Sequence, residues 1–388
     1  MVKGKGSVIF MKICDVVLNS IWYDPRVRKQ IAEYIRNGCD VSCVGMKCRR
    51  YDAQKVSKLP CKANIVAIKQ KYDGKQRSVF RKLMREHLKN KAVTDAIIAQ
   101  KPDLIHANDF NVLIPAYKAA KKLGCKILYD SHEINVENIG SGGFYQKYMY
   151  FTERRLVRKV DLMVCVSHAA SDYFANEYKI KNPTVITNCA LEREICRSEE
   201  KNDGFEVLNH GQFYEGRGYD IMVEAIPLLR DYPQIKLAVR GMGRLEGALR
   251  GRAEELGGEN FIFYPPVAVE ELIPMASRSM VGVAITEAIC LNFKLSVSNK
   301  IFEYAAAGLP VIMSDIPEHR YLNEKYHFGI ILPENSAQEF AKAVLKLYQE
   351  PDFYRECSEN AIRMSNELNW EKEFARLISL EESLFSKA

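Results

Sequence analysis

The sequence has no run of eighteen apolar residues, which excludes a conventional membrane-spanning helix. Its eleven cysteines include no CxxC pair, and an odd number of scattered cysteines is typical of reduced thiols in the cytosol. Cys39, Cys43 and Cys48 lie close together, but their spacing fits no common zinc pattern, so no metal site is expected. Near the start, Lys12 and Asp15 interrupt the apolar stretch that a signal peptide needs. We therefore expect a cytoplasmic protein.

The chain also lacks low-complexity tracts and repeats of solenoid length. Its hydrophobic and charged fractions, 47% and 27%, are typical of a folded globular protein rather than a disordered one. A length of 388 residues is too great for one hydrophobic core. We therefore expect two domains of ordinary size.

Acidic residues are scarce in the first half of the chain. Residues 1–190 contain 34 Lys and Arg against 17 Asp and Glu, whereas the remainder contains 22 against 32. Such an asymmetry predicts two domains with different partners. The basic half favours a polyanion or an anionic membrane surface.

Apolar strands alternate with helices along nearly the whole chain. Strands are predicted at 11–18, 39–46, 65–69, 103–109, 125–133, 161–167 and 183–188, and again at 205–213, 235–243, 261–267, 281–285, 309–313 and 330–333. Strands that are apolar throughout and joined by helices indicate parallel sheets buried on both faces. The predicted fold class is therefore α/β and doubly wound, with ligands bound at the carboxyl ends of the strands.

The polar, aperiodic stretch 189–204 divides this pattern in two and is interpreted as a linker. We predict a Rossmann-like N-terminal domain at 1–188 and a Rossmann-like C-terminal domain at 205–369. The final segment, 370–388, is amphipathic and has no strand after it. It is expected to form a helix that packs back on the N-terminal domain.

The segment NKIFEYAAAGLPV (299–311) is predicted to be a short helix that ends at Gly308 and leads directly into a strand. Asn299, Lys300 and Glu303 fall on one face of this helix. Lys300 lies in the first turn, where unpaired N–H groups and the helix dipole already favour an anion. A cation, a helix N-terminus and a carboxylate one turn later suit a ligand with a phosphate and a diol. The alternative is an ordinary amphipathic helix with an exposed Lys–Glu pair.

The segment HGQFYEGRGYD (210–220) follows a predicted strand and opens a helix. Gly211 and the glycines after it let the backbone approach a phosphate, and the guanidinium of Arg217 can bind two phosphate oxygens at once. Gly241, after the next strand, suits close packing against the same ligand. The alternative is a glycine-rich turn with a surface arginine.

Polar residues follow three predicted strands of the N-terminal domain, at the edge where side chains reach a ligand. These residues are Asp24, Arg26, His106, Asp109, His132 and Glu133. A purely structural role is the alternative for His106, Asp109 and His132.

In their order and spacing, these motifs resemble glycosyltransferase family 4 over nearly the whole chain. The matching segments are DPRVRKQ (24–30), NGCDV (37–41), IHAND (105–109), ILYDSHE (127–133), VCVSHAA (164–170), VITN (185–188), HGQFYEGRGYD (210–220), VRGMG (239–243) and NKIFEYAAAGLPV (299–311). The resemblance implies a GT-B fold, in which two Rossmann-like domains face each other across a cleft. It also implies a nucleotide-sugar donor on the C-terminal domain, an acceptor on the N-terminal domain, and transfer with retention of configuration.

The resemblance implies roles for individual donor-site residues. Arg217 stands where the family has one of two cations that grip the diphosphate, and Gln212 stands near the place of the other. Glu303 matches the carboxylate that takes the ribose hydroxyls. Leu295 replaces a second family glutamate near the transferred sugar, and Glu287 is the candidate substitute in the preceding loop.

The implied catalytic residues are His132, Arg217 and Lys300. His132 would hydrogen-bond the transferred sugar, while Arg217 and Lys300 would stabilise the charge of the leaving diphosphate. The acceptor proton would pass to that diphosphate, and Asp24, Arg26 and the other polar strand ends would line the acceptor side. The chain has no Asp-x-Asp motif, which fits metal-independent transfer from a UDP- or GDP-linked sugar without a further cofactor.

The segment KQRSVFRKLMREHLKNK (75–91) is strongly basic, has Glu86 as its single acid, and repeats apolar residues at helical spacing. This pattern suits a helix that lies on an anionic membrane surface. A solvated helix face is the alternative. Nucleic acid is not expected as a partner, because no base-reading motif accompanies the charge.

The sequence thus predicts a retaining glycosyltransferase that extends a surface polysaccharide or glycolipid, in the cytoplasm or at the inner face of the membrane. Two alternatives stay open. A nucleotide-sugar 2-epimerase of the same fold would need carboxylates clustered near the sugar, which the replacement at Leu295 disfavours. A non-catalytic nucleotide-binding protein would need only the donor site.

Overall fold

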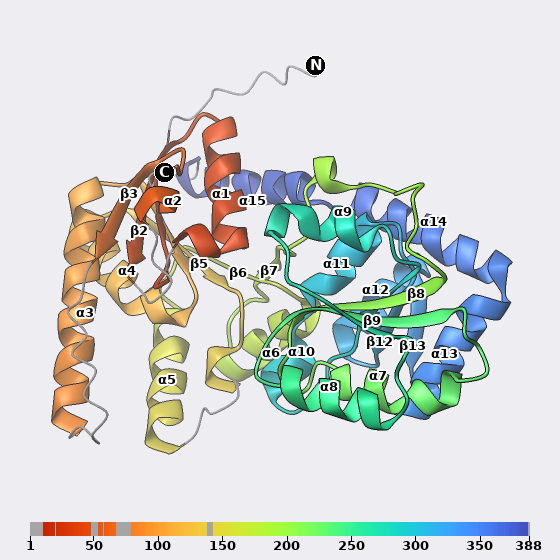
Figure 1. Cartoon of the computed structure of the whole chain (residues 1–388). Coiled ribbons are helices and arrows are strands. Elements are labelled where there is room, and N and C mark those ends of the chain that lie inside the picture. Colours follow the sequence, from red (N-terminus) through yellow and green to blue (C-terminus); the bar gives the residue numbers. More distant parts are fainter. Residues whose placement is uncertain are drawn as a thin grey trace.

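Two parallel sheets, each with helices on both faces, make up the structure (Figure 1). It is a computed structural model that describes residues 11–19, 21–47, 53–56, 58–66, 79–137 and 143–386. The strand orders are β3-β2-β1-β4-β5-β6-β7 in the first sheet and β10-β9-β8-β11-β12-β13 in the second. In both sheets the order reverses beside the first strand, which is the doubly wound topology. The predicted fold class is therefore confirmed.

The N-terminal sheet is built from seven strands. They are β1 (Lys12–Val16), β2 (Asp40–Met46), β3 (Lys62–Val66), β4 (Leu104–Asn108), β5 (Lys126–Ser131), β6 (Leu162–Cys165) and β7 (Thr184–Val185). The helices of this part are η1 (Ile21–Tyr23), α1 (Pro25–Arg36), α2 (Ala53–Val56), α3 (Val79–Gln100), α4 (Phe110–Leu123), η2 (Asn135–Glu137), α5 (Gly143–Leu156), α6 (His168–Tyr178) and η3 (Glu192–Glu194).

The C-terminal sheet has six strands. They are β8 (Phe205–Gln212), β9 (Ile235–Met242), β10 (Phe261–Tyr264), β11 (Val281–Ala284), β12 (Val311–Ser314) and β13 (Gly329–Leu332). Its helices are α7 (Tyr219–Glu224), η4 (Ile226–Leu229), α8 (Glu246–Glu255), η5 (Val269–Glu271), α9 (Leu272–Ala276), α10 (Leu291–Leu295), α11 (Asn299–Ala306), α12 (Pro317–Tyr326), α13 (Ala337–Gln349) and α14 (Pro351–Glu367), and the chain ends in α15 (Trp370–Phe385).

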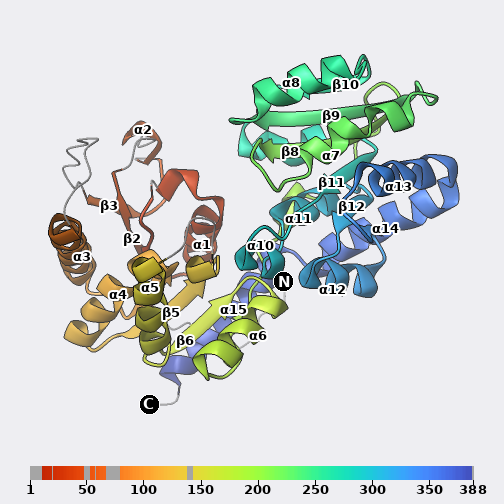
Figure 2. The same cartoon turned by 90° about the horizontal axis from the view of Figure 1, so that it is seen from below.

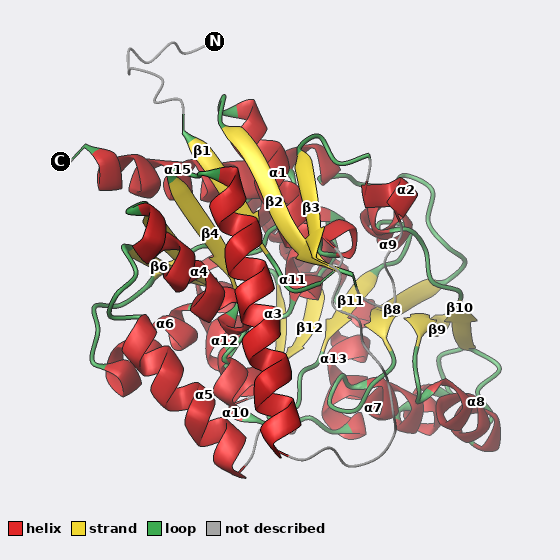
Figure 3. Cartoon of the chain, turned by 90° about the vertical axis from the view of Figure 1, so that its left-hand side faces the viewer, coloured by secondary structure: helices red, strands yellow, loops and turns green. Residues whose placement is uncertain are grey.

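The central strands are buried along their whole length, as β4 illustrates, because helices cover both faces of each sheet. Figure 3 shows α3 and α4 in front of the N-terminal sheet, with α5 on the same side next to α4. The opposite face carries α1 and α15. Trp370 and Phe374 of α15 pack with Ile31 and Tyr34 of α1 in one buried cluster, so the last helix belongs to the N-terminal core. Its apolar stripe explains this placement.

Two local differences from the sequence prediction have clear causes. The helix that the segment 210–220 opens is divided into α7 and η4, since Pro227 near the start of η4 has no N–H to continue a helix. The segment 286–298, expected to be a loop, contains α10. Figure 2 shows α10 at the junction of the two domains.

None of the helices in the described part of the chain combines the length and the apolar character that a membrane-spanning helix needs.

Candidate functional site

Two adjoining pockets lie between the N-terminal and C-terminal domains. Pro25, Asn188 and Asn299 line both of them, which makes the two pockets neighbours. The amide of Asn188 donates to Oδ1 of Asn299 at 3.3 Å, so the start of α11 touches the segment that leaves the N-terminal domain. The two pockets therefore form one site with contributions from both domains.

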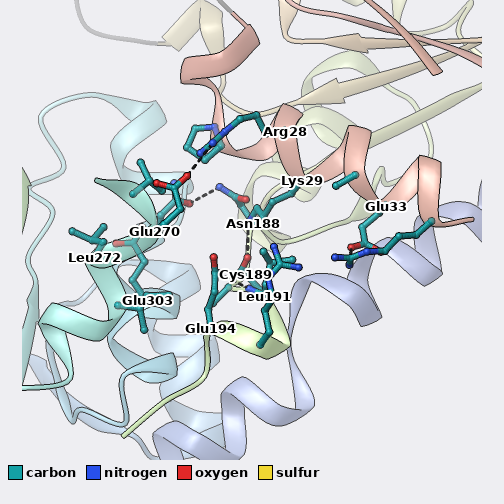
Figure 4. Close-up of a pocket in the computed structure, with 18 residues that line it drawn as sticks. Arg28, Lys29, Glu33, Asn188, Cys189, Leu191, Glu194, Glu270, Leu272 and Glu303 are labelled. Carbon is teal, nitrogen blue, oxygen red and sulfur yellow. Dashed lines mark hydrogen bonds and ion pairs between the residues drawn. The ribbon is translucent and has the colours of Figure 1, made fainter. Parts of the chain in front are cut away.

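The first pocket contains Glu303 and is shown in Figure 4. The N-terminal domain contributes Arg28, Lys29 and Glu33 from α1. The C-terminal domain contributes a rim from η5 and α9, where Glu270 pairs with Arg28 at 3.0 Å across the domain boundary. Charged groups of both signs thus surround the pocket.

Glu303 is fixed by a histidine from the neighbouring strand. Its Oε2 lies 2.7 Å from Nε2 of His210. The imidazole of His210 stacks on the ring of Tyr304, and the backbone N–H of His210 donates to the Tyr304 hydroxyl. Burial alone would raise the pKa of Glu303, but His210 and Lys300 hold it below its ordinary value. The result is a charged, partly exposed carboxylate with a defined position, which is what recognition of a diol requires.

Lys300 lies beside Glu303 on α11 and is 9% exposed. Its Nζ donates to Oδ1 of Asn209 at 2.6 Å and lies 5.1 Å from the centre of the Tyr219 ring. Burial and the nearby charge of Arg217 lower the pKa of Lys300 to about 7. A bound anion would stabilise the charged ammonium form and so offset the lowering of the pKa by burial and by Arg217. The surroundings of this amine are therefore suited to a phosphate.

The glycines at the ends of β8 and β9 serve close backbone packing. A Cβ on Gly241, which has a φ of +148°, would lie 1.8 Å from the carbonyl oxygen of Gly211. Gly211 has a φ of +131°, and a Cβ there would approach Lys300 and the hydroxyl of Tyr219 at 3.4 Å. Gly241 thus supports Gly211, and Gly211 keeps the space beside Lys300 open. The Tyr219 hydroxyl is buried without a hydrogen-bond partner.

The second pocket brings Arg217 and His132 to the same cavity. Arg217 extends from the turn between β8 and α7, where Gly216 and Gly218 have positive φ values of +77° and +71°. Its guanidinium stacks on Phe293 of α10 at 4.7 Å. The turn and the aromatic ring together aim a cation into the cleft from the C-terminal domain.

His132 enters the second pocket from the carboxyl end of β5. Its Nε2 lies 3.1 Å from Oδ1 of Asn108 and 3.4 Å from Asp130, and its Nδ1 lies 3.6 Å from Asp109. Burial alone would lower the pKa of His132, but Asp109 and Asp130 raise it to about 9. The imidazole is therefore cationic at neutral pH. Its Nε2 is engaged by Asn108 and Asp130, whereas its Nδ1 is 3.6 Å from Asp109, beyond hydrogen-bond distance, and is the nitrogen that remains to donate to a ligand.

Asp130 lies at the centre of a buried polar network behind His132. Arg26 donates Nε to Oδ2 and Nη2 to Oδ1 of this carboxylate at 2.9 and 3.0 Å, and Gln30 donates to Oδ2 at 2.8 Å. Nε2 of His106 lies 3.4 Å from Oδ2 of Asp130, and Nδ1 of His106 lies 2.8 Å from the hydroxyl of Tyr34. Although burial opposes it, the charge of Arg26 holds the pKa of Asp130 well below its usual range.

The structure places the remaining predicted residues in different surroundings. Asp24 caps α1 by accepting from the Val27 N–H, and with Glu133 it lines the second pocket. Arg26 also lines that pocket, yet it is 3% exposed. His106 is fully buried, and Gln212 is exposed; neither lines the two cleft pockets. Their acceptor-side and diphosphate roles stay predictions.

Leu295, at the position of the second family glutamate, faces the N-terminal domain. Its side chain packs against the N-terminal core, and its carbonyl accepts from Ser167 Oγ at 2.5 Å. On the same helix, Oδ1 of Asn292 accepts from the Ile134 N–H at 2.8 Å. Helix α10 therefore joins the domains where the family carboxylate is expected. Glu287, the predicted substitute, is half-buried near Gly216 and does not line the second pocket.

Only part of the basic segment 75–91 can be assessed. Residues 75–78 lie outside the described residues, as do the side chains of 79–83. In the described part, Met84 and Leu88 are exposed on α3, and Lys89 pairs with Glu86.

Two residues that organise the site were not singled out from the sequence. Asp130 stands in an apolar strand, and His210 at a strand end looks like an ordinary core histidine. For Asp130, an available signal was an isolated carboxylate in an otherwise apolar run, since such a charge needs a buried partner. For His210, no local pattern indicates Glu303 as its partner.

Two family models match the chain. One, described as Glycosyltransferase Family 4, matches residues 26–190, and the other, described as Glycosyl transferases group 1, matches residues 204–350. A curated relative, an uncharacterized glycosyltransferase of Haemophilus influenzae, is 23% identical over 255 residues, which are 62% of this chain and 68% of the relative.

Solved structures share the fold over nearly the whole chain. Sucrose-phosphate synthase from Thermosynechococcus elongatus is 16% identical with a TM-score of 0.78, covering 97% of this chain and 100% of its own. A glycosyltransferase from Rickettsia africae is 14% identical with a TM-score of 0.75, covering 98% and 100%. Anabaena HepE in complex with UDP-glucose is 15% identical with a TM-score of 0.73, covering 97% and 100%.

Proposed function

Since this chain belongs to glycosyltransferase family 4 and is a nucleotide-sugar-dependent enzyme of the GT-B fold, we propose that it transfers a sugar with retention of the anomeric configuration. The proposed donor is a UDP-linked sugar. The proposed acceptor is a glycan or glycolipid of surface polysaccharide biosynthesis.

One observation carries the donor assignment. Arg217 and Lys300 lie close enough for the charge of Arg217 to lower the pKa of Lys300, and Glu303 follows one turn later on α11. Two neighbouring cations and a carboxylate one turn away match a diphosphate linked to a ribose diol. In this arrangement Arg217 and Lys300 hold the diphosphate, and Glu303 accepts hydrogen bonds from the ribose hydroxyls.

The choice of UDP rests on the relatives. The Anabaena HepE structure contains UDP-glucose, and its chain covers this one almost completely. Val269, Leu272 and Ile273 line the same pocket as Glu303 and offer an apolar surface for the base. A pyrimidine against that surface is consistent with the same arrangement.

The second pocket is the proposed place of sugar transfer. Arg217 on one side stabilises negative charge that develops on the leaving diphosphate. On the other side, the cationic imidazole of His132 donates a hydrogen bond to the transferred sugar. The acceptor hydroxyl attacks the anomeric carbon on the face that the diphosphate leaves, and the diphosphate takes its proton. This route gives retention without a protein base and without a metal ion.

Hydrolysis of UDP-, GDP- and ADP-sugars tests this function. The enzyme is expected to release free sugar and UDP. Proton NMR at early times should find the released sugar in the same anomeric configuration that it had in the donor. Epimerised nucleotide sugar would identify an epimerase, and tight UDP binding without turnover would identify a non-catalytic protein.

A matched pair of arginine variants locates the activity. Arg217→Ala is expected to reduce turnover by about 100-fold or more, since one charge-stabilising donor is worth roughly that factor. Arg244→Ala is the control, because Arg244 belongs to the same domain but is exposed and paired with Glu215. Equal activity of the two variants would contradict the assignment.

A further inference from the structure

A groove on the N-terminal domain, away from the cleft, runs between α4 and α5. It has a volume of about 790 Å³, which is in the range of small-molecule sites. Its lining residues are Ile114, Tyr117, Lys118, Lys121, Lys147, Tyr148, Phe151, Thr152, Arg155, Leu156 and Lys159. Among these described residues there is no acid, so five cations surround an otherwise largely apolar and aromatic surface.

Two aromatic residues of this groove are strongly exposed. Phe151 is 61% exposed and Tyr148 is 44% exposed on α5. On α3, which packs against the other side of α4, Leu88 is 55% exposed and Met84 is 45% exposed. Figure 3 shows the three helices on one side of the molecule. A broad face of the N-terminal domain therefore combines exposed apolar groups with positive charge.

The position of this face relates it to the active site. In a parallel sheet with βα connections, each helix starts at the carboxyl edge of the preceding strand. Helix α4 starts directly after β4, and α5 follows β5 and η2, starting at Gly143. Met84 and Leu88 lie in the first half of α3, Tyr148 lies in the first half of α5, and Phe151 lies just past the middle of α5. Met84, Leu88 and Tyr148 are thus nearer the edge that carries the acceptor side of the cleft than the opposite edge.

We propose that the groove between α4 and α5 binds an anionic phospholipid, so that the face formed by α3, α4 and α5 rests on an anionic bilayer. The charge selects an anionic partner, and the aromatic and aliphatic lining selects one with an apolar chain. Lysines with long aliphatic stems beside exposed aromatic rings are typical of residues at a membrane–water boundary. Lys159 has a similar arrangement, since its Nζ lies 5.6 Å from the centre of the half-buried Tyr117 ring.

A purely ionic partner fits this groove less well. A nucleic acid or an acidic polysaccharide would use the five cations but would leave Phe151 in water. An amphiphile buries the apolar lining and neutralises the rim together. The proposal rests on the proposed function, because a membrane surface would bring the enzyme to a lipid-linked acceptor, but the lipid contact itself can be measured without sugar transfer.

Vesicle binding by the whole protein tests the groove. The protein is expected to float with vesicles of mixed phosphatidylcholine and phosphatidylglycerol and not with vesicles of pure phosphatidylcholine. Its binding to the mixed vesicles is expected to weaken at high salt. The triple variant Lys118→Gln, Lys147→Gln, Arg155→Gln should partition about 100-fold more weakly. The control triple variant Arg230→Gln, Lys342→Gln, Arg355→Gln removes the same charge from the C-terminal domain and should bind nearly as the parent does.

A fluorescence measurement tests whether the apolar lining is used. When the Phe151→Trp variant binds anionic vesicles, its added tryptophan emission is expected to shift to shorter wavelength. Brominated lipids are expected to quench that emission. Leu228→Trp, which replaces an exposed residue of the C-terminal domain, should not respond. Charge-dependent binding without quenching at position 151 would overturn the groove assignment and indicate a general polyanion surface.

Affinity for UDP separates the two proposals. The groove proposal is supported if the triple variant at Lys118, Lys147 and Arg155 keeps the parent affinity for UDP but no longer binds anionic vesicles. A parent protein that binds UDP but no anionic vesicle overturns the groove proposal alone. A protein that binds vesicles but no UDP leaves the groove intact and contradicts the proposed donor.

Discussion

Arg26 and Asp130 form a bidentate ion pair in which Nε and Nη2 donate to the two carboxylate oxygens at 2.9 and 3.0 Å, with both side chains buried. The pair joins α1 to the end of β5 directly behind His132. The guanidinium also lies 5.3 Å from the ring of Trp370, so the C-terminal helix covers the pair. The orientation of His132 therefore depends on contacts from three distant parts of the chain.

Removing the charge of Asp130 is expected to destabilise the fold and to alter His132. Asp130→Asn leaves Arg26 buried without its counter-ion, which should lower the free energy of unfolding by about 3–5 kcal/mol in urea titrations. Asp161→Asn, which removes a partly exposed carboxylate paired with Lys126, is the control and should cost about 1 kcal/mol or less.

The same variant should change the titration of His132. The pKa of His132 is raised to about 9 in the folded protein, so its protonation stabilises the fold. This stabilisation is complete below the ordinary histidine pKa and is lost as the pH rises toward 9. In Asp130→Asn, NMR titration should find the pKa of His132 lower. An unchanged pKa would contradict the role assigned to Asp130.

Glu381 of α15 is expected to make stability fall with rising pH. It accepts a hydrogen bond from Tyr34, its other oxygen is buried without a partner, and burial raises its pKa to about 8. The folded protein thus retains a proton that the unfolded chain releases above its ordinary pKa, so stability is lost between about pH 4.5 and pH 8. Glu381→Gln should remove this loss.

The size of this effect can be measured against its neighbour in the sequence. At neutral pH, Glu381→Gln is expected to stabilise the protein by on the order of 1–3 kcal/mol relative to the parent. Glu382→Gln is the control, because Glu382 is exposed on the same helix. A Glu381→Gln variant that unfolds more easily than the parent at pH 7 would show that the carboxylate is needed as an anion.

Glu303→Ala is expected to weaken UDP binding by about 10- to 100-fold, which is the scale of lost hydrogen bonds to a charged acceptor. The affinity for pyrophosphate, which has no ribose, should stay within a few-fold of the parent. Calorimetric titration measures both. Glu215→Ala, in the exposed part of the neighbouring loop, is the control. Equal losses for UDP and pyrophosphate would contradict the ribose contact, because pyrophosphate has no ribose.

Lys300 should couple UDP binding to proton uptake. Its pKa is about 7 in the free protein, and a bound diphosphate should raise it. The contribution of Lys300 to affinity is then nearly constant below pH 7 and falls as the pH rises above 7, by up to about tenfold per unit. Calorimetry in buffers of different ionisation enthalpy measures the proton. In Lys300→Met this contribution to uptake and pH dependence should disappear, leaving only the titration of the UDP phosphate itself. Uptake equal to that of the parent would point to another group.

The sequence predicted those parts of the site that depend on local pattern. Gly308 has a φ of +70° at the end of α11, as the helix stop requires. The turn at Gly216 and Gly218 has the positive φ values that its glycines favour. Strand ends and glycine turns are short-range features, so composition and spacing are enough to find them.

The partners of the predicted residues could not be predicted in the same way. His210 meets Glu303, and Arg26 meets Asp130, over separations of 93 and 104 residues. Such contacts arise from the packing of strands and helices, which periodicity does not specify. Helix α10 was missed for a related reason, since its short segment is held by Ile134 and Ser167 of the other domain rather than by its own propensity.

A crystal structure with bound UDP tests the central claim most directly. The account predicts a diphosphate within hydrogen-bond distance of the Arg217 guanidinium and of Lys300 Nζ, with both ribose hydroxyls on the carboxylate of Glu303. UDP bound in the cleft with its ribose away from Glu303 and its phosphates away from Arg217 and Lys300 would contradict it.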